Sequence, residues 1–154
     1  MELRVGQRAP EFTLSDQKGT PHSLKDYRGQ WVLLYFYPKD DTPGCTKEAC
    51  AFRDHLPRFE GSKVVVFGIS ADSVKSHAKF AEKYKIPFTL LSDEQKETVQ
   101  AYGVWAKKKF MGREYMGINR QSFLISPEGE IEKIYEKVDP ENHAEEVLND
   151  LARK

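Results

Sequence analysis

Runs of apolar residues alternate with segments of helical periodicity along most of this chain. Residues 31–37 are apolar at nearly every position, which is typical of a strand that helices cover on both faces of a sheet. Residues 63–70 have the same character, and residues 87–92 predict a short third strand. A segment with helical spacing follows each of the three runs, so the middle of the chain predicts alternating strands and helices.

The segments with helical spacing predict helices that each carry one apolar stripe. The first helix begins after residue 42, and Pro57 is expected to kink or end it. The second covers residues 74–84, with Asp72 and Ser73 as candidate caps, and the third covers residues 93–102 and stops at Gly103. A fourth covers residues 140–154. The residues expected on the inner faces recur at spacings of three and four: Ala49, Phe52, Leu56 and Phe59; Val74, Ala78, Ala81 and Tyr84; Ala144, Val147, Leu148 and Leu151.

Two β-hairpins are predicted outside this alternating region. Residues 9–24 turn at 16–19, where Pro21 confines the second arm to a sheet edge, and residues 121–125 and 131–135 flank a turn at 126–129. Residues 104–117 show no sustained period and are expected to form a loop or an irregular excursion. Its large apolar residues would either wall an active site or form a surface for a partner: Trp105, Phe110, Met111 and Met116. The element order predicts one α/β domain over residues 1–154, with a mixed central sheet, helices on both faces and an N-terminal β-hairpin.

Composition narrows the partners that this chain could have. Lys plus Arg equals Asp plus Glu at 24 each and the sequence pI is about 6.9, so no global field attracts nucleic acid or anionic lipid. The cluster at residues 107–109 is interpreted as a solvated loop. Apolar runs of roughly seven residues are too short to span a bilayer, and the first residues lack a basic and then apolar signal. The sequence therefore predicts a cytoplasmic protein that binds no nucleic acid and no membrane.

Cys45 and Cys50 are the chain's two cysteines, and in a reducing compartment such a pair is more often catalytic or metal-binding than structural. Thr42 suits a helix N-cap and Pro43 the first helical position, which places Cys45 in the first turn. Free backbone N–H groups and the helix dipole favour a thiolate there, and Gly44 would let a small substrate approach the backbone. A buried, inert cysteine is the competing interpretation.

The spacing of the two cysteines bears on which chemistry they could perform. On an ideal helix their Cα atoms lie roughly 8.6 Å apart, beyond the limit of about 7 Å for a disulfide, so a bridge would require local unwinding. A metal site is disfavoured, because there are only two thiols and the four histidines show no paired ligand spacing. A papain-like pair of cysteine and histidine has no local motif in its favour, yet the sequence does not exclude it.

These residues resemble those of a known family. Pro38, Thr42 and Cys45 match the Pro-x-x-x-Thr-x-x-Cys motif of the peroxiredoxins, which are thiol peroxidases with a thioredoxin-like fold, and Cys50 resembles the resolving cysteine of the peroxiredoxin Q or bacterioferritin comigratory protein subfamily. The similarity covers nearly the whole chain. It extends to Ala9-Pro-Glu-Phe-Thr-Leu, Gly103-Val-Trp, Phe110-Met-Gly and Gly117-Ile-Asn-Arg-Gln-Ser-Phe-Leu-Ile.

The resemblance implies an antioxidant enzyme that reduces hydrogen peroxide and organic hydroperoxides. It implies that Cys45 attacks the peroxide, that Thr42 and Arg120 bind the substrate and the thiolate, and that Pro38 shields the sulfur. The backbone N–H groups of Gly44 and Cys45 would stabilise the developing charge.

The resemblance also implies how the enzyme is recycled. Cys50 would form a disulfide with Cys45, and thioredoxin or a glutaredoxin-like dithiol would reduce it, with no cofactor and no metal. The chain would act as a monomer. Glu48 is interpreted as an exposed carboxylate that the helix dipole favours, with catalysis as the less favoured alternative.

Two functions remain as alternatives to the enzyme. A redox-switched holdase or peroxide sensor is possible because forming the bridge must unwind a helix. Disulfide exchange of the thioredoxin type is disfavoured by the Cys-x4-Cys spacing.

Overall fold

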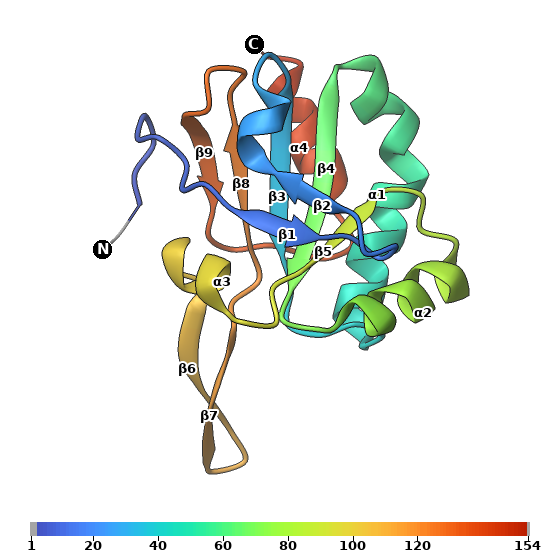
Figure 1. The fold of residues 1–154 in the computed structure, drawn as a ribbon, viewed down its shortest axis with the longest axis vertical. Helices are drawn as coiled ribbons and strands as arrows, with labels where there is room; N and C mark the ends of the chain where they lie inside the picture. Colours follow the sequence, from blue (N-terminus) through green and yellow to red (C-terminus); the bar gives the residue numbers. More distant parts are fainter. Residues whose placement is uncertain (1–2, 154) are drawn as a thin grey trace.

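The computed structural model describes residues 3–153, which form one seven-stranded sheet flanked by helices (Figure 1). The chain opens with β1 (Thr13–Ser15), β2 (Pro21–Ser23) and a 3₁₀ turn at Leu24–Tyr27. The alternating region follows as β3 (Trp31–Phe36), α1 (Pro43–Gly61), β4 (Val64–Ser70), α2 (Val74–Tyr84), β5 (Thr89–Ser92) and α3 (Glu97–Ala101). The chain ends with β6 (Trp105–Phe110), β7 (Arg113–Ile118), β8 (Gln121–Ile125), β9 (Ile131–Tyr135) and α4 (His143–Leu151).

The strand order in the sheet is β2-β1-β5-β4-β3-β8-β9. Strands β3, β4 and β5 are parallel, as their crossover helices require, while β8 and β9 and the N-terminal hairpin pair antiparallel at the two sides. The predicted mixed α/β sheet with an N-terminal hairpin is therefore confirmed. Pro21 stands in the edge strand, where its missing N–H removes no ladder bond from an inner strand.

Strand β3 explains why the sheet needs helices on both faces. Leu33 and Tyr35 face the core made with α1, α2 and α4, while Leu34 and Phe36 face the core made with α3 and the 3₁₀ turn. A strand that is buried on both faces cannot alternate apolar with polar residues, so it reads as a continuous apolar run. The end of β3 is thus held firmly where the chain enters the segment with the cysteines.

One expectation for each of the four helices needs correction. Helix α1 does not end at Pro57 but continues to Gly61. Helix α3 is only five residues long, because the Asp93 carboxylate accepts the Val99 N–H and so caps a helix that begins at Glu97 and not at Asp93. On α2 the fully buried side chains are His77 and Phe80, which the proposed apolar stripe had left out. Helix α4 begins at His143, and Lys154 of the predicted helix lies outside the described residues.

The irregular excursion predicted for residues 104–117 is wrong. These residues form a two-stranded hairpin, β6–β7, whose two-residue turn places both Met111 (φ 51°) and Gly112 (φ 80°) in the left-handed region. Such turns match the twist of paired strands. Both faces of the outer hairpin are exposed to solvent, so no alternation of apolar and polar residues marked the strands in the sequence.

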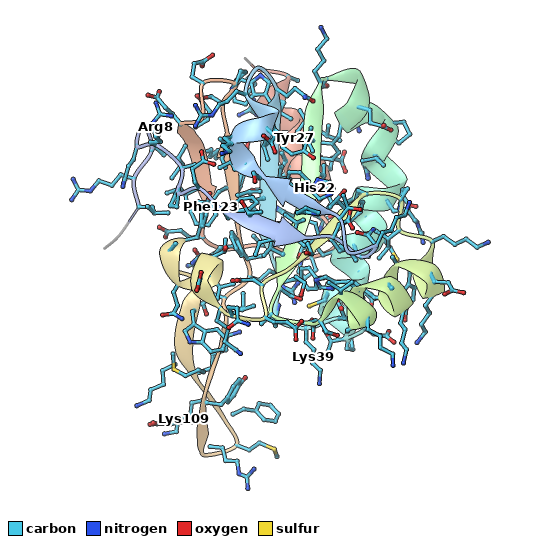
Figure 2. The ribbon with its side chains drawn as sticks, viewed as in Figure 1. Arg8, His22, Tyr27, Lys39, Lys109 and Phe123 are labelled. Atoms are coloured by element: carbon cyan, nitrogen blue, oxygen red, sulfur yellow. The ribbon has the colours of Figure 1, made fainter. Side chains whose placement is uncertain are left out.

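The hairpin β6–β7 projects from the body of the protein at the end where α1 begins (Figure 1). Lys39, just before α1, and Lys109, in β6, both lie at that end (Figure 2). Among residues 3–153, no helix has the length and apolar content needed to cross a membrane.

Candidate active site

Cys45 lies in the first turn of α1, directly after the strand β3 and its connecting turn. Thr42 is the N-cap residue and Pro43 the first helical residue, and the helix begins with a bond from the Thr46 N–H to the Thr42 carbonyl (2.8 Å). The Cys45 side chain is 1% exposed, whereas Cys50, still within the same helix, is half-buried. Both cysteines are free thiols. The sulfur of Cys45 therefore sits beside the unpaired N–H groups of a helix N-terminus.

Arg120 brings a fixed positive charge to Cys45. It directly precedes β8, which pairs antiparallel with β3 so that Gln121 lies opposite Phe36 at the end of β3. Its Nη2 donates to the Cys45 Sγ at 3.4 Å and its Nη1 to the Glu48 Oε1 at 2.8 Å. Burial opposes the charge of Arg120, but the negative charges of Cys45 and Glu48 outweigh it and raise the pKa of the guanidinium. One guanidinium thus holds both a thiol and a carboxylate.

Gly44 and Thr42 have more specific positions than their sequence pattern indicated. A Cβ on Gly44 would lie 2.9 Å from the Arg120 Nη2, so the missing side chain leaves room for the guanidinium. The Thr42 hydroxyl makes no capping bond and instead donates to the Lys39 carbonyl at 2.9 Å. Pro38 is half-buried in the turn between β3 and α1. The fold thereby brings Arg120 to the Cys45 sulfur beside Gly44, while Thr42 stands at the N-cap of the same helix and Pro38 lies in the turn before it.

Comparisons with known proteins agree with this arrangement. Residues 5–134 match the AhpC/TSA family. Peroxiredoxin Bcp of Escherichia coli is 47% identical over 96% of this chain and 94% of its own length. The chain belongs to the peroxiredoxins, in the Bcp/PrxQ subfamily. It is a thiol peroxidase.

Solved structures extend the likeness to three dimensions. A crystal structure of a Xylella fastidiosa PrxQ variant has a TM-score of 0.94 and 38% identity, covering 99% of this chain and 98% of its own. A Xanthomonas campestris bacterioferritin comigratory protein, described for its alkyl peroxide reduction activity, has a TM-score of 0.87 and 39% identity, covering 92% of this chain and 90% of its own. The predicted thioredoxin-like fold is therefore confirmed.

Glu48 of this peroxiredoxin is not the exposed carboxylate that the sequence suggested. It is fully buried and ion-paired with Arg120, and among residues 3–153 its Oε2 has no hydrogen-bond partner. Burial outweighs the attraction to Arg120 and raises the pKa of Glu48 from 4.5 to about 7. The sequence signal for this position was present, because Glu48 lies three residues after Cys45 on the same helical face.

The raised pKa of Glu48 predicts how the stability of the folded protein depends on pH. A carboxyl whose folded pKa lies above its unfolded pKa favours folding most below about pH 4.5 and loses that contribution as pH rises through about 7. We expect the free energy of unfolding of the unaltered chain to fall by about 3 kcal/mol relative to Glu48→Gln between these limits. Urea unfolding of both chains at pH 4.5 and pH 8 measures the difference. The exposed Glu60→Gln is the control, and parallel pH profiles for Glu48→Gln and the unaltered chain would contradict the prediction.

A buried polar network fixes the turn that precedes the cysteine. The Asp40 carboxylate accepts the Tyr37 hydroxyl at 2.6 Å and the Ser76 hydroxyl at 2.8 Å, and it lies 2.7 Å from the His77 Nδ1. The Asp40 N–H donates to Asp72 at 2.8 Å, and the other ring nitrogen of His77 meets the Leu91 carbonyl at 2.9 Å. The turn is therefore tied to β4, β5 and α2, although no sequence motif indicated it.

The same network contains residue types that can bind a metal, but their ligand atoms already have hydrogen-bond partners in the protein. One ligand atom each from Asp40, Asp72 and His77 lies within 4.8 Å of the others. The Asp72 Oδ2 already accepts from the Asp40 N–H at 2.8 Å and from the Ser70 hydroxyl at 2.7 Å. Since protein donors saturate these oxygens, the geometry fits a hydrogen-bonded support for the turn better than a cation site.

Lys108 differs from its neighbours in the lysine cluster, which the sequence grouped as one solvated loop. Its Nζ hydrogen-bonds to the Ile118 carbonyl, two residues before Arg120, and its stem passes Gly117, where a Cβ would meet the Lys108 Cδ at 3.2 Å. Burial, reinforced by the charge of Arg120, lowers the pKa of Lys108, while the charge of Cys45 acts in the opposite direction. A second cation thus lies within electrostatic reach of the sulfur.

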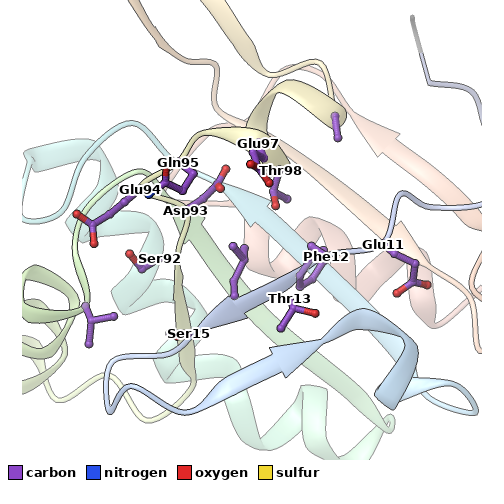
Figure 3. A pocket seen from close by; sticks show the side chains of 13 residues that line it. Glu11, Phe12, Thr13, Ser15, Ser92, Asp93, Glu94, Gln95, Glu97 and Thr98 are labelled. Carbon is purple, nitrogen blue, oxygen red and sulfur yellow. The ribbon is translucent and has the colours of Figure 1, made fainter.

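A surface pocket of about 500 Å³ lies away from this site, between β1 and the segment that leads into α3 (Figure 3). Its lining includes Glu11, Asp93, Glu94 and Glu97 but neither cysteine nor Arg120. One carboxylate oxygen of Asp93 accepts the Val99 N–H and so caps α3. The acidic lining is explained by that cap and by exposed side chains.

Proposed function

We propose that this thiol peroxidase reduces hydrogen peroxide and organic hydroperoxides through Cys45. The observation that carries the proposal is the 3.4 Å contact between the Arg120 Nη2 and the Cys45 Sγ at the N-terminus of α1. The Cys45 thiolate attacks one peroxide oxygen, so an S–O bond forms while the O–O bond breaks. The leaving oxygen takes the bonding electron pair and a proton and departs as water or an alcohol. The described alkyl peroxide activity of the Xanthomonas protein supports the wider substrate class.

The neighbours of Cys45 supply positioning and charge. Arg120 stabilises the thiolate and the oxygen on which charge develops, and the N–H groups of Gly44 and Cys45 add to it. Thr42 lies at the N-cap, where its hydroxyl can exchange the Lys39 carbonyl for a peroxide oxygen. Pro38 shields the sulfur from bulk water. Glu48 acts through Arg120, which it holds in place, and is therefore a positioning residue.

Cys50 resolves the sulfenic acid of Cys45. Its thiolate attacks the Cys45 sulfur, expels the hydroxyl as water after protonation, and forms a disulfide. Because both residues lie in α1, that helix must open locally. The network around Asp40 anchors the turn before the helix, and the fully buried Phe52 stacks on Tyr35 with ring centroids 4.6 Å apart. Opening between these two fixed points leaves Phe52 in place, whose exposure would cost about 3 kcal/mol.

A dithiol protein then reduces the bridge, with thioredoxin or a glutaredoxin-like protein as the proposed reductant. Two unbridged thiols in one helix fit a cytoplasmic, reducing compartment. A resolving cysteine in the same chain needs no second subunit, so we propose that a monomer is sufficient. A redox-switched holdase or peroxide sensor is the alternative function, supported by the helix opening that the disulfide requires.

Peptide mapping after a single equivalent of peroxide tests the proposal. Trypsin cleaves after Lys47, between the two cysteines, so the bridge would join peptide 40–47 to peptide 48–53. We expect the intact mass to fall by roughly 2 Da, the two hydrogens lost, and the joined peptides to separate on reduction. Sustained peroxide consumption with thioredoxin, its reductase and NADPH would distinguish an enzyme from a switch. A Cys45 that reacts no faster than free cysteine would refute the proposal.

A further inference from the structure

The hairpin arm, β6–β7 (Trp105–Ile118), carries an unusual surface for this protein. Of the five large apolar side chains that are exposed among residues 3–153, four lie on this arm. Phe110 is 66% exposed, Met111 90%, and Tyr115 and Met116 49% each. Monomeric proteins rarely concentrate their exposed apolar groups in this way unless a partner covers them.

The arm is also basic, although the chain as a whole is neutral. It carries four cationic side chains and a single carboxylate, Glu114, which Lys107 pairs at 2.9 Å. Arg113 is paired with the exposed Phe110 near the tip. A partner that covers the arm must therefore offer apolar surface together with acidic groups.

The register of the hairpin shows which of its faces belongs to the active-site side. Lys108 pairs with Tyr115 and Phe110 with Arg113, and side chains of paired residues and of alternate residues share a face. Lys108 is the residue whose Nζ reaches the Ile118 carbonyl and whose charge acts on Cys45 and Arg120. Tyr115, Phe110 and Arg113 thus continue outward on the face that begins beside the sulfur.

The base of the arm is firmly seated. Ile118 is buried, the Asn119 N–H donates to the Val104 carbonyl at 2.7 Å, and the Lys96 ammonium lies 5.9 Å from the centre of the Trp105 ring. Six residues of strand extend the arm by about 20 Å. Figure 2 shows Lys109 far out on the arm, at the end of the molecule where Lys39 precedes α1. The arm is therefore anchored at its base and projects at the end of the molecule where α1 begins.

We propose that the arm is the docking surface for the protein that reduces the Cys45–Cys50 disulfide, and that this reductant presents an acidic and apolar rim around its dithiol. The inference rests on the proposed function. The reductant is the one macromolecule that must reach this end of the protein in every cycle. Phe110 and Tyr115 supply apolar contact area, and Arg113 on the same face attracts and orients the acidic rim.

Steady-state turnover with two reductants tests the arm directly. Phe110→Ser with Tyr115→Ser is expected to lower kcat/KM for thioredoxin roughly 10-fold to 30-fold, as the loss of interface anchors does. Turnover with dithiothreitol and the first reaction with peroxide should stay unchanged, because a small dithiol needs no docking surface. Arg113→Glu should lower kcat/KM for thioredoxin most strongly at low salt. Val5→Ser is the matched control, since Val5 is 62% exposed but lies outside the arm.

Each other outcome would overturn the inference. One is a kcat/KM of the Phe110 and Tyr115 variant for thioredoxin within about twofold of the unaltered chain. A second is an equal loss of turnover with dithiothreitol, or an equal loss in Val5→Ser. A third is an unaltered chain that turns over with dithiothreitol but with neither thioredoxin nor glutaredoxin. Sedimentation that shows a dimer broken by the Phe110 and Tyr115 changes would assign the arm to a second copy. Failure of the proposed function would look different, because the unaltered chain would then form no disulfide and turn over with no reductant.

Discussion

Cys50→Ser is expected to reduce one equivalent of peroxide at the unaltered rate and then to stop. The first step needs only the Cys45 thiolate, the helix N-terminus and Arg120, which contacts Sγ at 3.4 Å, and Cys50 lies more than a turn further along α1. Recycling needs a second thiol in the chain. Without it the sulfenic acid persists and proceeds to sulfinic acid in excess peroxide. Stopped-flow mixing resolves the first step, and turnover with thioredoxin, its reductase and NADPH measures the second.

Two further variants make the Cys50 result decisive. Cys45→Ser should lose both the first step and turnover, which shows that Cys50 cannot replace the attacking thiol. The conservative variant Thr46→Ser, at a half-buried position next to Cys45, should behave like the unaltered chain in both assays. A Cys50→Ser chain that still forms an intramolecular bridge, or that turns over with thioredoxin at the unaltered rate, would refute the role assigned to Cys50.

Arg120→Met should slow the reaction of Cys45 with peroxide by roughly 100-fold to 1,000-fold, the loss typical when one donor to a developing oxyanion is removed. Methionine keeps much of the apolar stem but removes the donors that contact the Cys45 Sγ and the Glu48 Oε1. Arg120→Lys should recover only part of the rate, because an ammonium keeps the charge without the fork that reaches both partners. Single-turnover stopped-flow kinetics at a fixed pH measures the rate constants.

Arg120→Met alone would leave the Glu48 carboxyl buried without its partner, which can destabilise the fold. The double change Arg120→Met with Glu48→Gln removes both charges and keeps the test meaningful if the single variant unfolds. Circular dichroism establishes that each variant is folded before its rate is compared. A folded double variant that reacts with peroxide within about threefold of Glu48→Gln would show that Arg120 is not part of the catalytic machinery.

The opening of α1 is the step at which fold and chemistry constrain each other. The reduced site needs the helix intact, because Cys45 depends on its N-terminal N–H groups, and the disulfide needs the helix opened. The structure limits where opening can occur, since Asp40 is tied to Asp72 and His77 before the helix and Phe52 is buried after Cys50. The two cysteines therefore lie between two anchored points, and opening the helix there must displace the buried Glu48 and Ala49.

The sequence by itself determined the strands that are buried on both faces, the first turn of the helix at Cys45 and the place of Arg120 beside it. These features depend on local patterns and on a short motif, and both leave a mark in the order of residues. Tertiary structure alone decided the rest. Glu48 became a buried partner of Arg120 only because β8 folds next to β3, and His77 became the support of Asp40 only because α2 packs beneath the turn.

The hairpin arm shows why some elements cannot be predicted from periodicity. The outer parts of its strands are exposed on both faces, so their residues do not alternate between apolar and polar. The hairpin is defined instead by the left-handed turn at Met111 and Gly112. Contacts between residues far apart in the chain have no period in the sequence, because they depend on which elements meet. The sequence fixes the local chemistry of Cys45, while the packing of distant elements decides which charges surround it and which surface stands beside it.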